Sequence, residues 1–173
     1  GRLREWAYSR EIADKVVFGL RKLGIDAERI VNEDTDVPLS ERCRRANSIY
    51  SATGKKAILI SIHCNAAGSG DSWMKAKGWS VFVSNNASGN SKKLADCLAQ
   101  AAECIPVSVR KPMPGQLYWQ QNLAICRDSN CPAILTENFF QDNKDDVEYL
   151  LSREGKDAVA RIHIEGVAKY LGL

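Results

Sequence analysis

The 173-residue sequence predicts an α/β domain of three layers, in which a mostly parallel, twisted sheet is flanked by helices on both faces. Segments with helical spacing of apolar residues alternate with short apolar segments of strand length along the whole chain. That alternation is typical of a sheet built with right-handed crossovers. The segment 57–62, AILISI, is apolar without alternation, which indicates a central strand covered on both faces.

The first half of the chain is expected to form two helices and two strands. Residues 3–23 place apolar side chains on one helical face, and residues 25–31 have the character of a short strand. A second helix opens at Pro38 and ends near Gly54. Strand 57–62 follows directly.

The second half continues the same alternation after a glycine-bearing loop. A helix follows the polar loop 84–91, and the proline-rich stretch 106–115 is expected to be a surface loop. The remaining expected elements are strands over 78–84, 123–128 and 132–140 and helices over 143–151 and 154–171.

Composition favours one globular domain over residues 1–173. Apolar residues make up 45% of the chain and charged residues 26%, and no apolar run approaches the roughly 20 residues that a membrane span needs. The net charge of +3 arises from 24 basic and 21 acidic residues without a basic block, so nucleic acid is not an expected partner. We expect a monomer with no membrane span.

The six cysteines contain no C-x-x-C pair, which argues against a zinc ribbon or a redox dithiol. Cys43 and Cys97 lie at apolar positions of expected helices and are interpreted as small buried side chains. The spacing of Cys126 and Cys131 leaves a disulfide between them open.

Polar residues end two of the apolar strands, and they define the candidate site. His63 follows strand 57–62, and Glu137 lies near the end of strand 132–140. Ligands of open α/β sheets bind outside the carboxyl ends of the strands. Histidine and carboxylate are zinc ligands, so His63 and Glu5 are candidate ligands, and Glu137 suits a general base. Asn65 is a candidate to orient substrate or support His63.

Each of these residues also has a structural interpretation. A lone histidine is more often a structural residue than a ligand, and a single glutamate at a strand end is usually solvated or paired. His163 lies on the apolar stripe of the last expected helix and is interpreted as a packed core residue. Arg127 and Asn122 are candidate substrate contacts, although Arg127 could equally pair with neighbouring acids. The tryptophans at 73, 79 and 119 either line a glycan groove or pack.

Four ordered segments resemble the zinc-dependent N-acetylmuramoyl-L-alanine amidases of bacterial cell walls and phage lysins. They are LREWAYSREIA, VPLSERCRRAN, LISIHCNAA and PAILTENFFQDN. The resemblance implies the zinc amidase fold, one Zn²⁺ per chain held by Glu5 and His63, and Glu137 as the catalytic acid/base. It also implies a further histidine ligand, in a first strand resembling Asp-Pro-Gly-His-Gly-Gly, upstream of Gly1. We therefore expect the first strand and upstream segment to be missing.

The same resemblance implies the substrate and the site of action. Such enzymes cut the amide between the lactyl group of N-acetylmuramic acid and the L-alanine of the stem peptide in peptidoglycan. The expected location is periplasmic or secreted, with a phage lysin acting on the cell wall as the alternative. Two other functions stay open at this point: a non-catalytic peptidoglycan-binding module of the same fold, and a zinc peptidase that acts on the stem peptide.

Overall fold

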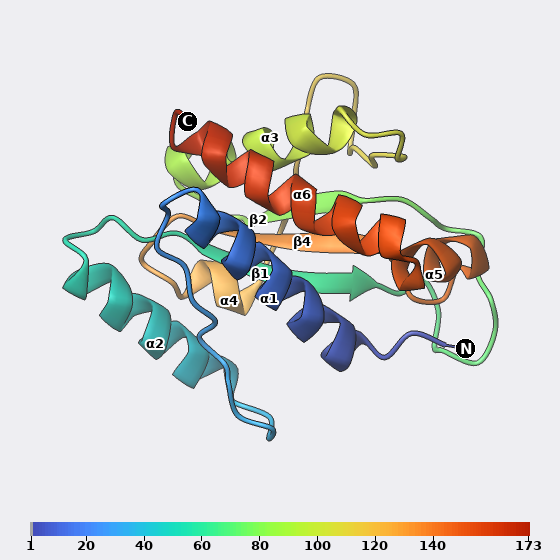
Figure 1. Cartoon of the computed structure of the whole chain (residues 1–173), viewed down its shortest axis with the longest axis horizontal. Coiled ribbons are helices and arrows are strands. Elements are labelled where there is room, and N and C mark those ends of the chain that lie inside the picture. Colours follow the sequence, from blue (N-terminus) through green and yellow to red (C-terminus); the bar gives the residue numbers. More distant parts are fainter. Residues whose placement is uncertain (1) are drawn as a thin grey trace.

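The computed structural model describes residues 2–173 and contains a four-stranded sheet with helices on both faces (Figure 1). Helices and strands are mixed along the chain, but they alternate less regularly than the sequence predicts, because α1 is followed directly by α2, β1 by β2 and α5 by α6. Their order is α1 (Glu5–Lys22), α2 (Leu39–Ala52), β1 (Leu59–Asn65), β2 (Ser80–Ser84), α3 (Gly89–Glu103), β3 (Trp119–Gln121), α4 (Ala124–Arg127), β4 (Ala133–Phe140), α5 (Lys144–Leu151) and α6 (Arg153–Tyr170).

The sheet has the strand order β1-β4-β2-β3. β1 pairs with β4 in parallel and β2 pairs with β3 in parallel, whereas β2 and β4 are antiparallel. The predicted α/β class is confirmed, and the sheet is mixed: two parallel pairs meet at an antiparallel contact. β4 therefore has a neighbour on each side, while β1 is paired, within residues 2–173, only with β4.

Two apolar clusters on opposite faces of the sheet produce the three layers. Helices α1, α3 and α6 pack on one face, where Figure 1 shows α1 and α6 crossing in front of the strands. Helix α1 buries Tyr8, Ile12, Val16 and Leu20, which are spaced four residues apart and so lie along one side of the helix. On the other face, Cys43 and Ala46 of α2 join the buried residues of α4 and Leu59 of β1.

Residues 25–31 do not form the predicted strand. Arginine side chains, instead of a neighbouring strand, satisfy several of their carbonyl groups. Arg45 donates to the Ile30 carbonyl at 2.8 Å, Arg21 to the Ala27 carbonyl at 3.0 Å, and Arg29 to the Val31 carbonyl at 3.1 Å. The segment is thus an extended connection between α1 and α2.

Residues 123–128 were also predicted as a strand, and this prediction is wrong. They contain the short helix α4, in which the Arg127 amide donates to the Leu123 carbonyl at 2.7 Å and the Asp128 amide to the Ala124 carbonyl at 2.9 Å. Ile125 and Cys126 are neighbours in sequence and are both buried, which a one-sided strand does not allow. The strand that pairs with β2 at that edge of the sheet is β3, which precedes this helix.

All six cysteines are free thiols, so the spacing of Cys126 and Cys131 does not indicate a disulfide. Burial raises the pKa of Cys126 to about 12, with smaller contributions from Cys131 and Cys43. Within residues 2–173, no helix combines the length and apolar character needed to cross a membrane.

Candidate active site

The centre of the candidate site is a pair of residues on adjacent parallel strands. His63 of β1 is the register partner of Glu137 of β4. Register partners project to the same face of a sheet, and so do residues two apart on one strand. His63, Glu137 and Ser61 therefore share one face, near the carboxyl ends of both strands.

Glu5, at the start of α1, completes this group. Its Oε1 lies 3.2 Å from His63 Nδ1 and accepts a hydrogen bond of 3.0 Å from the Cys64 amide. Burial alone would raise the pKa of Glu5, but the hydrogen bonds from His63 and from the Cys64 amide hold that pKa below its usual value. Glu5 is therefore a carboxylate at neutral pH.

His63 lies between two oxygen partners. Its Nδ1 faces Glu5, and its Nε2 lies 3.0 Å from Ser61 Oγ. The hydrogen bond to Glu5 raises the pKa of His63, although burial opposes this, and the charges of Glu5 and Glu137 act in the same direction as the hydrogen bond.

Glu137 has the properties expected of a proton-transfer residue. Burial raises its pKa to about 7; the nearby Glu5 adds to the rise, and His63 opposes it. Its Oε2 is buried and has no hydrogen-bond partner among the described residues. A carboxyl group that is poised near neutrality and has one free oxygen is suited to take up and release a proton.

The donor atoms partly fit a zinc ion. Zn–N and Zn–O bonds in tetrahedral sites place neighbouring ligand atoms roughly 3.3 Å apart, and His63 Nδ1 and Glu5 Oε1 are separated by 3.2 Å. Imidazole and carboxylate are also zinc ligands. Within residues 2–173, however, no three His, Cys, Asp or Glu side chains are grouped so that they could hold a metal. Glu5 and His63 are thus the two side chains of this group whose spacing fits a zinc ion.

Gln141 supports the site and was not identified from the sequence. Its Nε2 donates to the Cys64 carbonyl at 3.1 Å and lies 3.4 Å from Glu5 Oε2, and its backbone amide donates to the Asn65 carbonyl at 2.8 Å. Gln141 follows β4 directly, four residues after Glu137. Its position just after the end of an apolar strand is the feature of the sequence that could have identified Gln141.

The other predicted site residues lie apart from this group. Asn65 Oδ1 accepts from the Ala66 amide at 2.9 Å, so its side chain shapes the following turn instead of supporting His63. Arg127 pairs with Asp128 at 2.8 Å and donates to Asn122 Oδ1 at 2.9 Å. The described contacts bring Arg127 and Asn122 together but do not connect them to Glu5, His63 or Glu137.

The three tryptophans have different environments. Trp79 is completely buried and belongs to the core, so it cannot line a glycan groove. Trp119 is half-buried and stacks on Phe82 with ring centroids 6.1 Å apart. Trp73 is 45% exposed and lies under the Arg2 guanidinium, which is 5.6 Å from its ring centroid.

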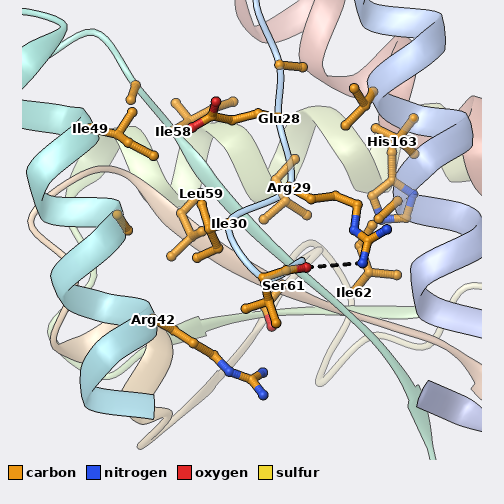
Figure 2. Close-up of a pocket in the computed structure, with 18 of the residues that line it drawn as sticks. Glu28, Arg29, Ile30, Arg42, Ile49, Ile58, Leu59, Ser61, Ile62 and His163 are labelled. Carbon is orange, nitrogen blue, oxygen red and sulfur yellow. Dashed lines mark hydrogen bonds between the residues drawn. The ribbon is translucent and has the colours of Figure 1, made fainter. Parts of the chain in front are cut away.

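A long groove of about 1200 Å³ runs beside β1, and Glu5 and His63 are among its lining residues. Figure 2 shows Ile58, Leu59 and Ile62 on one side of the groove and residues 28–30 of the connection between α1 and α2 on the other. Most of its lining is apolar. The groove lies at the edge of the sheet where β1 has no neighbouring strand among the residues that the structure describes.

The fold and the site together define a class of protein. It is a three-layer α/β domain in which a histidine and a glutamate near the carboxyl ends of two parallel strands meet a second glutamate at the start of a helix, a group suited to hydrolysis. Comparison with known proteins gives the family. The sequence profile of the N-acetylmuramoyl-L-alanine amidases matches residues 1–169, and the chain belongs to this family.

Individual relatives agree with this assignment. The chain is 28% identical over 145 residues to an endolysin of Bacillus phage SPP1, covering 83% of this chain and 49% of the endolysin. The chain thus spans about half the length of that curated relative. An N-acetylmuramoyl-L-alanine amidase from Clostridium difficile 630 is 25% identical and superposes with a TM-score of 0.78, over 98% of this chain and 85% of the amidase.

A further solved structure shows the same fold at lower identity. An N-acetylmuramoyl-L-alanine amidase of Nostoc punctiforme is 21% identical and has a TM-score of 0.76, with 98% of this chain and 85% of the amidase covered. The predicted resemblance to these amidases is confirmed in both sequence and fold.

Proposed function

We propose that this chain is the catalytic part of a peptidoglycan hydrolase that cleaves the amide between the lactyl group of N-acetylmuramic acid and L-alanine. The observation that carries the proposal is the pairing of His63 with Glu137 across β1 and β4, with Glu5 3.2 Å from His63, in a member of this family. The proposed site of action is the bacterial cell wall, reached from the periplasm or after release, and the proposed form is a monomer.

Glu5 and His63 would hold one zinc ion. When bound, such an ion polarises the scissile carbonyl and lowers the pKa of a bound water. Glu137 takes the proton of the attacking water on its free Oε2 and gives it to the departing L-alanine nitrogen. Its pKa of about 7 makes both transfers accessible near neutral pH.

We propose that the third ligand is a histidine on a strand upstream of Gly1 that lies beside β1. Two observations support this. In the described part of the chain, β1 is paired on one side, and the groove along its other side is lined by residues of β1 together with Glu5 and His63. A strand placed there would pair with β1 and could bring a side chain close to the two ligands.

The test is cleavage of a defined muramyl-peptide by the parent chain and by Glu137→Gln, with zinc or with chelator, followed by labelling of new amino groups. Amidase activity predicts zinc-dependent labelling of L-alanine, reduced by about 100-fold or more in the variant. Labelling of a different stem-peptide residue would identify a peptidase instead. If the parent chain shows no activity, the assay is repeated with a chain extended by an upstream segment that contains a histidine.

A binding module is the second candidate, because the described residues provide only two of the ligands of a catalytic zinc site. Sedimentation with intact sacculi in the presence of chelator, with no peptide release from either the parent or the extended chain, would favour it over the amidase.

A further inference from the structure

The site is connected to the core by a buried polar network that the proposed chemistry does not use. Asn138, directly after Glu137, is at its centre. Four side chains of this network are fully buried: Trp79, Thr136, Asn138 and His163. Buried polar groups are costly unless they are paired, and here each one is paired.

The direction of every hydrogen bond in this network follows from chemistry. The Trp79 indole can only donate, so Asn138 Oδ1 accepts its hydrogen bond of 2.9 Å. The Asn138 amide nitrogen therefore donates, to the His63 carbonyl at 3.0 Å and to Thr136 Oγ1 at 2.9 Å. The orientation of the amide is thus fixed by Trp79.

His163 forms the far end of the network. The Val159 carbonyl can only accept, so His163 Nδ1 carries the proton of their 2.7 Å hydrogen bond. Nε2 then accepts from the Thr136 hydroxyl at 2.8 Å. The network thus extends from α6 through β4 to the main chain of β1.

The decisive contact is at the peptide group between His63 and Cys64. Asn138 binds its carbonyl oxygen, and Glu5 binds its N–H at 3.0 Å. One peptide plane is held at both ends by two side chains from different parts of the chain. Rotation of this plane would move His63 away from Glu5 and from its register with Glu137.

The β1–β4 pairing is irregular at this point, which increases the need for such a restraint. After the pair His63 and Glu137, the next pair is Asn65 and Phe140, so two residues of β1 face three of β4. A bulge disrupts the regular ladder where it occurs. Side chains therefore supplement the backbone in holding the two strands together.

We propose that Asn138 is a positioning residue, which holds the His63–Cys64 peptide group and thereby sets the orientation of His63 relative to Glu5 and Glu137. Asn138 itself does not touch the reacting atoms. Its importance for catalysis rests on the amidase activity proposed above, whereas its effect on the peptide group does not.

The test compares Asn138→Leu with Ser91→Ala in the protein as it stands. Leucine has a similar shape and removes every side-chain hydrogen bond of the asparagine. Ser91 is a matched control because it is buried and accepts from the amide of Ala133, at the opposite end of β4. Trp79→Phe is a second variant, which keeps Asn138 but removes the donor that orients it.

The first readout is hydrogen exchange of the Cys64 amide relative to the Leu59 amide of the same strand. We expect this ratio to rise by about tenfold or more in Asn138→Leu, to rise less in Trp79→Phe, and to stay unchanged in Ser91→Ala. Equal ratios in all three variants would overturn the proposal, whether or not the chain is active.

The second readout is the division between kcat and KM on the muramyl-peptide. A positioning role predicts a kcat about 10- to 100-fold lower in Asn138→Leu, with KM within about twofold of the parent. If kcat falls no further in Asn138→Leu than in Ser91→Ala, the claim that Asn138 affects catalysis is overturned. Absence of activity in both the parent and the chain extended upstream would contradict the proposed function alone, because the exchange ratio still decides the role of Asn138.

Discussion

Phe139 packs edge-on against Tyr149, with ring centroids 5.5 Å apart and an interplanar angle of 65°, while its own backbone has φ of 67°. A residue with a Cβ atom in this left-handed region costs about 1–2 kcal/mol relative to its ordinary conformation. Phe139 lies in the bulge of β4, two residues after Glu137. The aromatic contact and the burial of the ring offset the strain, and they stabilise the bulge beside Glu137.

This strain predicts that glycine is a less destabilising replacement than alanine at position 139, the reverse of the order at an ordinary strand position. Phe139→Ala and Phe139→Gly both lose the packing of the ring, at about 3–5 kcal/mol. Glycine adopts positive φ without strain, so Phe139→Gly should be more stable than Phe139→Ala by about 1 kcal/mol. Urea unfolding of both variants measures the difference.

Ile134 provides the control, since it lies in the regular part of the same strand and is fully buried. There, Ile134→Ala should be more stable than Ile134→Gly, by about 0.5–1 kcal/mol. If glycine is the less stable replacement at both positions, the backbone of Phe139 is not strained.

The raised pKa of Glu137 predicts how Glu137→Gln changes stability with pH. The folded pKa of about 7 lies above the ordinary value of 4.5, so the folded chain binds more protons between these pH values, and its stability falls as the pH rises through this window. Glutamine removes this loss. In chelator, we expect the Tm of Glu137→Gln minus that of the parent to be clearly larger at pH 8.5 than at pH 4.5. An equal difference at both pH values would show that Glu137 is not destabilised by its surroundings.

The sequence allowed prediction of the α/β class and most elements because apolar periodicity reports directly on burial. It also identified Glu5, His63 and Glu137, which the structure brings together at the ends of α1, β1 and β4. The interpretation of His163 as a core residue was correct, since it is fully buried. These residues are visible locally, either at the end of an apolar run or on an apolar stripe.

Long-range contacts account for what the sequence did not show. Residues 25–31 have strand-like composition, but the partners of their carbonyl groups are arginines, one of them Arg45 of α2. Residues 123–128 contain the apolar pair Ile125 and Cys126, which is compatible with a strand or with one helical turn. Packing of this pair against α2 favours the helix. The role of Asn138 depends on Trp79, which is distant in sequence, so no local pattern could indicate it.

The two histidines should behave differently in an NMR titration of the chain in chelator. Burial lowers the pKa of His163 to about 4, so its imidazole should stay neutral from pH 8 to pH 5. Its Nδ1 should carry the proton, because this atom donates to the Val159 carbonyl. His63 should titrate with a pKa above the ordinary 6.5, because Glu5 stabilises its charged form.

Nitrogen chemical shifts of the two imidazole rings measure both the tautomer and the titration. Glu5→Gln is the control variant, and it should lower the pKa of His63 while His163 stays unchanged. Titration of His163 near 6.5, or a proton on its Nε2, would contradict the buried network described above.

Asp142 anchors the loop that follows β1. Its carboxylate accepts hydrogen bonds from the backbone amides of Ala67 and Gly68, at 2.9 and 2.8 Å, and its own carbonyl accepts from the Met74 amide at 2.6 Å. Asp142 is almost completely buried, so these hydrogen bonds form away from water. One residue just after β4 thus holds both ends of an otherwise exposed loop.

Loss of this carboxylate should release the loop without unfolding the sheet. In Asp142→Ala, two backbone amides lose a charged partner, at about 1.5–3 kcal/mol for each hydrogen bond. Lys75 and Lys77 are exposed in this segment, so trypsin should cut there at least about tenfold faster than in the parent. Asp145→Ala removes an exposed acid three residues away and should leave the cleavage rate unchanged. Mass spectrometry of the first fragments locates the cut, and faster cleavage throughout the chain instead of in this loop would show that Asp142 stabilises the whole fold.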